Sequence, residues 1–439
     1  MPFRSDIVII GAGVAGLAAA KVLTRAGVSV HLVEARERIG GRIFTLHEPG
    51  FGWPIELGAE FVHGRPPEIW EMLRGAGADA IEGKGVDWCS RQGRISTCDF
   101  FEKVDKFLER MEVTPADQTF RQFEDQHPDV PPEVKRDAEM YVEGFNAARA
   151  AEISVNSLVR AGKAEEEIGG ERVFRIRGGY DFVPRTLLAQ CDPHYLRISL
   201  NTVVTSVERG RGPVLVRARF GSHEVTFSAP RALITLPLGV LQAGSVRFVP
   251  ALEQKGEALS QLVMGSVVRV TLRFREKFWD ELEGSRGHTL ENMRFLFSDN
   301  PYFPTWWTVA PLDAPVITAW APAEKGQQLS GRGEDYIRER AIESLGSVLR
   351  VGNDLVSAML ERAYTHDWQT DPFSCGAYSY VRSGGDGAQQ QLAQPVDDTL
   401  FFAGEATESE GHFATVHGAI ATGYRAGREL LERAGRKAA

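Results

Sequence analysis

The order of apolar and polar positions at the start of the chain indicates a strand, a helix and a second strand. An unbroken apolar run covers residues 7–10, apolar residues recur at helical spacing from Leu17 to Ala26, and a second, mostly apolar run with two polar residues covers residues 28–33. Short continuous apolar runs are typical of buried parallel strands, which are joined by a crossover helix. The beginning of the chain therefore predicts a βαβ unit.

Helical spacing predominates between residues 66 and 165. Helices are predicted at residues 67–75, 99–110, 119–123 and 133–150, with glycine and proline at the joins. We interpret this part as a helical insertion rather than as more of the sheet.

Strand-like runs return after the insertion. Strands are predicted at residues 203–208, 214–220, 232–236, 263–274, 295–297, 306–309 and 317–320, and helices at 182–189, at 334–349 and after Thr415. The Gly- and Gln-rich stretch 383–394 is predicted to be a surface loop.

Strands able to complete one sheet thus lie at both ends and in the middle of these 439 residues, so the predicted fold class is α/β with two interleaved domains. A Rossmann-type nucleotide-binding domain would take residues 1–65, 176–245 and 355–439, and an α+β substrate domain would take residues 66–175 and 246–354. We expect the active site at the seam between them.

The first turn carries the residues of a dinucleotide fingerprint. Gly11, Gly13 and Gly16 follow the first strand, and Glu34 ends the second. The first glycine makes the tight turn, the second lets backbone approach a pyrophosphate, and the third lets the helix pack closely on the sheet. Glu34 can accept hydrogen bonds from ribose hydroxyls, and the helix N-terminus favours phosphate. The motif predicts an ADP-containing cofactor.

The composition narrows the classes of partner. A net charge of −9 argues against nucleic acid and against an anionic membrane surface, and it suits a cationic substrate. No apolar run reaches the length of a membrane span, and no metal site is predicted. The fingerprint begins within ten residues of Met1, so no signal peptide is expected before it.

The cysteines Cys89, Cys98, Cys191 and Cys375 form no CxxC pair and no disulfide-dense pattern. A reducing compartment fits this pattern best, and we expect a soluble cytoplasmic protein. The assembly stays open, with a homodimer as the candidate.

A second glycine-bearing motif lies near the other end of the chain. An apolar strand ends at Gly404 and Glu405, and a helix with small residues on its packing face begins near Thr415. The free N–H groups at the start of that helix would face an anionic or electron-rich group. On its own, this stretch is also compatible with an ordinary strand–loop–helix.

Taken together, the blocks resemble the FAD-dependent amine oxidases, which include monoamine oxidases, polyamine oxidases and lysine-specific histone demethylases. The resembling stretches are Val8–Gly16, Glu34–Arg42, Glu56–Gly64, Arg177–Pro184, Leu233–Leu241, Trp368–Tyr380 and Phe401–Gly423. They occur in the family's order and span nearly the whole chain.

The resemblance implies FAD bound in an extended form. Arg36 and Arg42 would lie near the phosphates, Glu405 near the ribityl–pyrophosphate region, and Trp368 against the isoalloxazine. The FAD contacts carried over are Gly11, Gly13, Ala15, Gly16, Glu34, Ala35, Arg36, Gly40, Gly41, Arg42, Gly58, Ala59, Glu60, Val204, Trp368, Gly404, Glu405, Thr415 and Val416. Ala377 stands where monoamine oxidases attach their flavin to a cysteine, so non-covalent FAD is expected, and Cys375 is interpreted as a buried, unreactive thiol.

The resemblance also implies the catalytic residues. Tyr378 and Thr415 would form opposite walls of an amine cage, and Glu60 would hold a distal ammonium, unless it is a surface carboxylate without a ligand. Arg269 stands where the family usually has a lysine, where it could hold a water beside flavin N5 or turn outward into an ion pair. Trp306 and Trp307 alternate on one strand, so at most one should face the substrate tunnel.

The function expected from this resemblance is oxidation of a primary amine or polyamine by hydride transfer to flavin N5. The imine would hydrolyse to an aldehyde, and O2 would be reduced to H2O2. The alternatives are an L-amino-acid oxidase that uses Arg65 for the substrate carboxylate, an amine dehydrogenase with poor O2 reactivity, and a flavin-binding scaffold with little turnover. Histone demethylation is disfavoured because the chain leaves no room for a helical tower.

Overall fold

A five-stranded parallel sheet forms the nucleotide-binding part of the computed structural model, which describes residues 2–435. Its order is β11 (Leu196–Ser199), β3 (Val30–Val33), β2 (Ile7–Ile10), β15 (Arg231–Ile234) and β24 (Leu400–Phe402). All residues of β2 and β3 are buried, as continuous apolar runs predict. The expected βαβ unit is confirmed, with α1 (Val14–Arg25) as its crossover.

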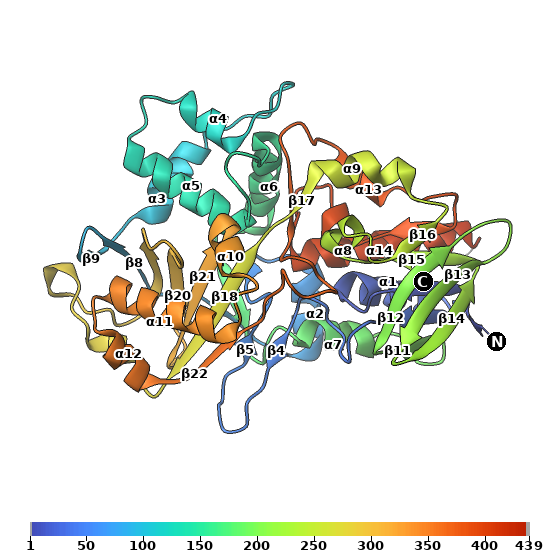
Figure 1. Cartoon of the computed structure of the whole chain (residues 1–439), viewed down its shortest axis with the longest axis horizontal. Helices are drawn as coiled ribbons and strands as arrows, with labels where there is room; N and C mark the ends of the chain where they lie inside the picture. Colours follow the sequence, from blue (N-terminus) through green and yellow to red (C-terminus); the bar gives the residue numbers. More distant parts are fainter. Residues whose placement is uncertain (1, 436–439) are drawn as a thin grey trace.

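The two ends of the chain meet because α14 (Val416–Arg433) packs directly on α1 (Figure 1). A Cβ added to Gly423 would lie 2.2 Å from the carbonyl oxygen of Ala15 and 2.8 Å from the Cβ of Ala18. Glycine on this face of α14 is therefore required for the close approach of the two helices. This contact places the second glycine-bearing motif beside the first.

A second five-stranded sheet lies against the first, at the right of Figure 1. Its order is β1 (Phe3–Arg4), β14 (His223–Ala229), β13 (Val214–Phe220), β12 (Thr202–Glu208) and β16 (Arg247–Val249). The register of β12 against β13 shifts between Val204 and Ser206. Apolar side chains of both sheets share one core, which includes Val8, Val204 and Phe227.

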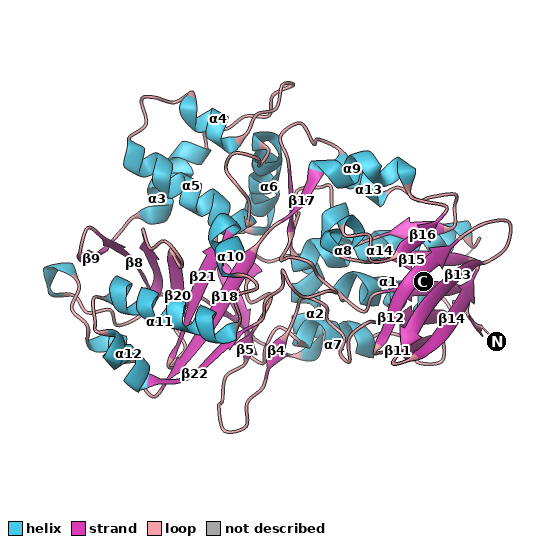
Figure 2. Cartoon of the chain, in the orientation of Figure 1, coloured by secondary structure: helices cyan, strands magenta, loops and turns pink. Residues whose placement is uncertain are grey.

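A seven-stranded sheet dominates the other half of the molecule (Figure 2). Its order is β22 (Leu360–Thr365), β18 (Val267–Phe274), β21 (Val316–Pro322), β20 (Thr305–Thr308), β19 (Met293–Ser298), β8 (Val86–Arg91) and β9 (Arg94–Thr97). The helices α10 (Ala323–Leu329), α11 (Glu334–Leu349) and α12 (Asn353–Met359) follow its strands, and the apolar face of α11 packs on the sheet.

The expectation that residues 66–165 are helical throughout is wrong in one part. The helices α2 (Pro67–Ala76), α3 (Phe100–Leu108), α4 (Phe120–Asp125), α5 (Pro132–Asn146) and α6 (Val155–Ile168) are present, but β7 (Ala80–Glu82), β8 and β9 lie between α2 and α3. These strands are short and only partly buried, so their period-2 pattern is weak. The predicted loop 383–394 contains a helix, α13 (Ala388–Ala393).

The remaining elements are short strands, helices and 3-10 turns between the larger ones. They are β4 (Thr45–Leu46), β5 (Ile55–Glu56), β6 (Val62–His63), β10 (Val173–Ile176), β17 (Leu262–Met264), β23 (Ser379–Val381), α7 (Phe182–Ala189), α8 (Leu238–Gln242), α9 (Gly256–Gln261) and the 3-10 turns η1 (Glu253–Lys255), η2 (Phe278–Glu281), η3 (Ser285–Gly287) and η4 (Glu405–Thr407).

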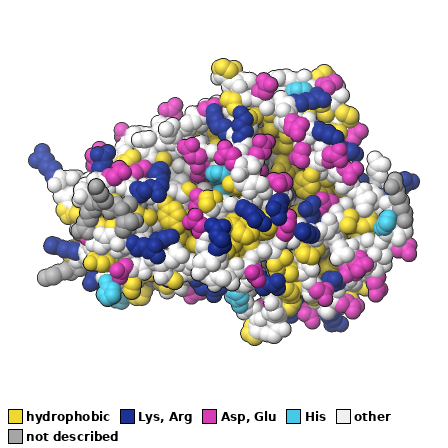
Figure 3. Space-filling model, turned by 180° about the vertical axis from the view of Figure 1, so that it is seen from behind, with side chains coloured by type: hydrophobic (Ala, Val, Ile, Leu, Met, Phe, Trp, Pro, Cys, Tyr) yellow, Lys and Arg dark blue, Asp and Glu magenta, His cyan; other side chains and the backbone are white. Residues whose placement is uncertain are grey.

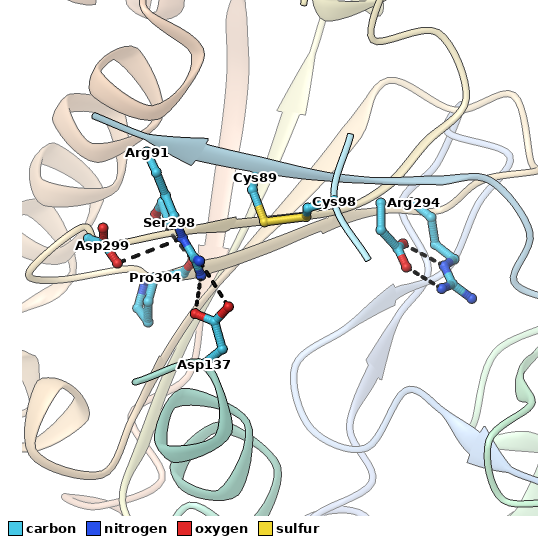
Figure 4. Close-up of a disulfide and its surroundings, with 9 residues drawn as sticks. Cys89, Arg91, Cys98, Asp137, Arg294, Ser298, Asp299 and Pro304 are labelled. Atoms are coloured by element: carbon cyan, nitrogen blue, oxygen red, sulfur yellow. Dashed lines mark hydrogen bonds and ion pairs between the residues drawn. A yellow bond between two sulfur atoms is a disulfide. The ribbon is translucent and has the colours of Figure 1, made fainter. Parts of the chain in front are cut away.

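A disulfide joins Cys89 in β8 to Cys98, two residues before α3 (Figure 4). The cysteine spacing did not indicate this pair, and a disulfide does not fit the reducing compartment that we expected from it. Cys191 and Cys375 are free; Cys191 is buried, whereas Cys375 is only partly buried.

The surface mixes both signs of charge, with acidic and basic side chains interspersed over the face in Figure 3. Within residues 2–435, none of the helices has both the length and the apolar character needed to cross a bilayer.

Candidate active site

One large cavity of about 1390 Å³ runs through the seam of the molecule. At one end it is lined by the glycine turn after β2 and by the end of β3, and at the other by residues of α3, α5 and α6. The polar side chains of the two ends are held by different kinds of partner.

The glycines of the first turn leave room for a ligand at the cofactor end. Gly11 has a φ of +106°, and a Cβ there would lie 2.5 Å from the hydroxyl of Thr235. A Cβ on Gly16 would lie 2.1 Å from the carbonyl oxygen of Gly11, so the third glycine serves close packing. A Cβ on Gly13 would meet no atom within 4 Å, which leaves an open approach to the backbone. This cradle fits a pyrophosphate.

Glu34 ends β3 at the rim of this cradle. Its carboxylate accepts hydrogen bonds from the backbone N–H of Ala12 at 2.7 Å and of Arg36 at 2.9 Å. The side chain is only 6 % exposed, and burial raises its pKa above the ordinary value. The carboxylate is therefore fixed by backbone groups on either side of the turn and lines the cavity.

Arg36 and Arg42 both line the cavity, but each is engaged with a carboxylate. Arg36 forms a bidentate pair with Asp371 at 2.7 and 2.9 Å, and Arg42 donates to Glu405 at 2.9 Å and to the carbonyl of Ala377 at 2.7 Å. These pairs hold the guanidinium groups in place. Their expected contact with phosphates stays a prediction.

The second motif supplies the opposite wall of the cofactor end. Glu405 accepts from the hydroxyl of Ser379 at 2.6 Å as well as from Arg42. Thr415 caps α14, because its hydroxyl accepts from the N–H of Gly418 at 3.0 Å and donates to the carbonyl of His412 at 2.7 Å. The N-terminus of α14 therefore faces the cavity, and the hydroxyl of Thr415 already donates one hydrogen bond and accepts another.

The structure brings together almost all of the predicted cofactor contacts. Trp368 is buried and donates from Nε1 to the carbonyl of Leu57 at 2.8 Å, and Val204 lies where β12 shifts register. Of the nineteen carried-over positions, all but Gly16 line the cavity.

The end of the cavity that is lined by α3, α5 and α6 is walled by aromatic side chains from several elements. Because the amine cage was predicted here, we call it the amine end or the aromatic end. Tyr378 donates from its hydroxyl to the carbonyl of Phe145 at 2.9 Å, and burial raises the pKa of the phenol. The other aromatic residues of this wall are Phe61, Phe100, Phe101, Tyr141, Phe145, Phe295, Phe297, Trp307, Trp320 and Phe413. The prediction for the tryptophan pair is confirmed: Trp307 lines the cavity, whereas Trp306 lies in the core and donates to the carbonyl of Phe303.

Glu60 is buried between two guanidinium groups. Its oxygens accept from Arg175 and from Arg269 at 2.5 Å each, and from Nε1 of Trp307 at 3.1 Å. Burial alone would raise the pKa of Glu60, but the charges of Arg269 and Arg175 hold it below its ordinary value. The structure therefore argues against both interpretations from the sequence, since Glu60 is neither a surface carboxylate nor free to hold a distal ammonium.

Arg269 points inward from β18 and is 6 % exposed. Besides pairing with Glu60, it donates from Nη1 to the carbonyl of Gly58 at 3.0 Å, and its guanidinium lies 5.7 Å from the ring centroid of Trp307. The outward ion pair is not what the structure shows. Arg269 is part of the cavity wall.

Several residues of this end were not found from the sequence. Arg175 shows no signal there, because nothing local to β10 reveals a partner 115 residues away. Tyr141 and Phe145 stand four residues apart on α5, a spacing that could have indicated an aromatic face. His417 also lines the cavity. His63 lines it too, but it was not missed, because it lies in the stretch Glu56–Gly64 that carries part of the resemblance and was expected beside Glu60 at the substrate tunnel.

Arg65 does not take part in the cavity wall that the described residues form. It is exposed and stacks over the rings of Trp70 and Phe174. In residues 2–435 there is also no group of three or more His, Cys, Asp and Glu side chains suited to hold a metal ion.

Comparison with curated proteins shows relatives of two kinds. The chain is 28 % identical over 450 residues to Lysine-specific histone demethylase 1 homolog 2 of Oryza sativa subsp. japonica, covering 97 % of this chain and 57 % of the relative. It is 26 % identical over 463 residues to Polyamine oxidase 4 of the same plant, covering 98 % and 89 %. The chain thus spans about half, or less, of the demethylase relatives, at 57, 30 and 53 % of their lengths.

Solved structures share the fold over the whole chain. A putrescine oxidase bound to putrescine matches with a TM-score of 0.82 at 20 % identity, covering 98 % of this chain and 100 % of that one. Cyclohexylamine oxidase from Brevibacterium oxydans IH-35A matches with a TM-score of 0.79 at 20 % identity and the same coverage.

The model of the family described as flavin containing amine oxidoreductase matches residues 14–103 and 103–431. This match begins one residue after Gly13 and covers Glu34 and most of the residues that line the cavity. The chain therefore belongs to the family of flavin-containing amine oxidoreductases.

Proposed function

We propose that this protein binds FAD non-covalently and oxidises a primary amine or a polyamine. The single observation that carries the proposal is the continuous cavity, which joins a dinucleotide cradle to an aromatic-walled end. The flavin would supply the two-electron acceptor for a hydride from the α-carbon, with O2 reduced to H2O2 afterwards. The imine would then hydrolyse to an aldehyde.

The residues of the cofactor end fit FAD. Gly13 and the start of α1 would take the pyrophosphate, and Glu34 a ribose hydroxyl. Non-covalent attachment is supported by Ala377, which offers no nucleophile, and by Cys375, which does not belong to the described cavity wall. Thr415 and the first N–H groups of α14 would face the electron-rich edge of the ring system.

The amine end would favour the neutral form of the substrate. An alkylammonium with a pKa of about 10 needs about 4 kcal/mol to be presented as free amine at pH 7. Aromatic walls lower that pKa by desolvation, and the carboxylate of Glu60 does not oppose this effect because two arginines already neutralise it. The cavity would thus position an uncharged amine.

The alternatives rank below this proposal. An L-amino-acid oxidase needs a cation for the substrate carboxylate, and Arg65 lies outside the described wall of the cavity. The names of several relatives suggest a demethylase as a second alternative, and the chain spans 57 and 30 % of the length of two of them. The Cys89–Cys98 disulfide favours oxidising conditions, which argues against the cytoplasmic location expected from the sequence.

Anaerobic mixing of the flavin-loaded protein with a panel of monoamines, diamines and polyamines tests the proposal. Bleaching of the flavin absorbance by at least one amine is the expected result, and a protein that no amine reduces would instead be a flavin-binding scaffold. Stopped-flow mixing of the reduced protein with O2 then separates an oxidase from a dehydrogenase. We expect Arg269→Lys to react faster with O2, because lysine can give up a proton and arginine cannot.

A further inference from the structure

Three histidines cluster where the amine end meets the start of α14. His63 in β6 and His417 in α14 both line the cavity. His412, in the loop before α14, is partly exposed and does not belong to the described cavity wall. Nε2 of His417 lies 3.2 Å from Nδ1 of His412, and the two ring centroids are 4.9 Å apart. The pair therefore connects the cavity wall to a more exposed position.

Two other ionisable groups at the aromatic end, Glu60 and Tyr378, are already engaged. Glu60 is held by two arginines and an indole, and the hydroxyl of Tyr378 donates to the carbonyl of Phe145. His63 packs edge-on against the ring of Phe145, at 5.2 Å between centroids, so the histidines lie beside the tyrosine wall. Imidazole can accept a proton at this end, as can the carboxylate of Glu165 in α6, which also lines the cavity.

Both cavity histidines are neutral at pH 7, which is the form that accepts a proton. Burial lowers the pKa of His63 to about 4. Burial, with the charges of His412 and His63, lowers the pKa of His417 to about 3. Glu408, an acidic group of the same loop, lies close enough to His412 for their charges to interact, and Glu408 is itself buried. A proton taken by His417 would be passed on rather than kept.

The proposed amine oxidation, on which this inference rests, requires such a path. The substrate arrives as an ammonium and must react as a neutral amine, so one proton has to leave a cavity with aromatic walls. We propose that His417 and His412 form the proton exit of the amine site.

The transfer balances without any redox change. One N–H bond of the substrate ammonium breaks, and a bond to that proton forms at Nδ1 of His417. The proton on Nε2 of His417 passes to Nδ1 of His412 across the 3.2 Å contact, and the proton on Nε2 of His412 goes to solvent. The path needs the tautomers in which Nε2 of each ring carries its hydrogen.

The test replaces His412, which lies outside the cavity wall, and compares two substrates. In His412→Gln, flavin reduction by an ordinary alkylamine at pH 7 should slow at least about tenfold. The difference from wild type should shrink as the pH approaches the pKa of the alkylammonium, because more of the substrate then arrives as neutral amine. A fluorinated amine that is already neutral at pH 7 should be oxidised at the wild-type rate. His194→Gln is the control, because His194 is exposed and contacts Asp192.

A second measurement does not depend on turnover. A tertiary-alkyl primary amine has no α-hydrogen, so it binds without being oxidised, and a pH-indicator dye then reports proton release. We expect slower release from His412→Gln than from wild type and from His194→Gln. Equal release rates, or an equal loss with both substrates, would overturn the relay, whereas a wild-type protein that no amine reduces would overturn the proposed function instead.

Discussion

The two ends of the cavity each contain a buried glutamate, and the two are held by opposite means. Glu34 accepts from two backbone N–H groups, so its charge is met by partial dipoles and stays available to a ligand. Glu60 accepts hydrogen bonds from two guanidinium groups and an indole, so its negative charge is neutralised by side chains of the protein itself. The charge carried by the partners, rather than burial itself, therefore separates these two carboxylates.

The largest effect is expected from the glycines of the cofactor end. Gly16→Ala puts a Cβ 2.1 Å from the carbonyl of Gly11, so the helix must move off the sheet, and we expect a loss of about 3 kcal/mol or more together with the flavin. Gly13→Ala meets no atom within 4 Å and should keep the wild-type melting temperature while losing affinity for FAD. Calorimetry and flavin content separate the two. Equal melting temperatures for Gly16→Ala and Gly13→Ala would contradict the assignment of Gly16 to helix packing and of Gly13 to ligand contact.

At the amine end, removing the charge of Glu60 should be nearly as costly. Glu60→Gln leaves two buried guanidinium groups without a counter-charge, which is expected to lower the free energy of unfolding by about 3–5 kcal/mol. The double variant Glu60→Gln/Arg269→Gln should regain part of this loss, because one unpaired cation has gone. Urea melts measure both. A double variant less stable than Glu60→Gln would contradict this, because Arg269 would then stabilise the fold without its ion pair to Glu60.

A third glutamate, Glu56 in β5, sharpens the comparison through pH. Burial raises its pKa from 4.5 to about 8, against hydrogen bonds from Thr45 and from the N–H of Tyr180. Between these values the folded state binds a proton that the unfolded state lacks, so stability falls with rising pH by up to about 1.4 kcal/mol per unit. In Glu56→Gln this contribution should vanish. Urea melts of both proteins at pH 5 and pH 8 test it, and parallel changes in the two would contradict the assignment.

The smallest effect concerns the disulfide at the edge of the seven-stranded sheet. The Cys89–Cys98 disulfide closes a loop with a sequence separation of 9, and removing it should cost about 2–3 kcal/mol. The double variant Cys89→Ser/Cys98→Ser should therefore melt at a lower temperature, with unchanged FAD content. Cys375→Ser is the control, since Cys375 is free. If reducing agent leaves the wild-type melting temperature unchanged, the pair does not stabilise the fold.

The sequence determined the cofactor end because the groups that build it are neighbours along the chain. Glu34 binds N–H groups 22 and 2 residues away, and the glycine turn lies between the strands that frame it. Hydrophobic periodicity and the demands of a tight turn are sufficient to read such a unit.

The tertiary structure alone decided the amine end. The partners of Glu60 are 115, 209 and 247 residues away. Cys89 and Cys98 are only 9 residues apart, but their pair was not found because β8 and β9, which pair at the edge of the seven-stranded sheet, were not predicted. Periodicity also missed the weak strands β7, β8 and β9 and the short helix α13. Which side chains neutralise one another depends on how distant segments dock, and local pattern carries no record of that docking.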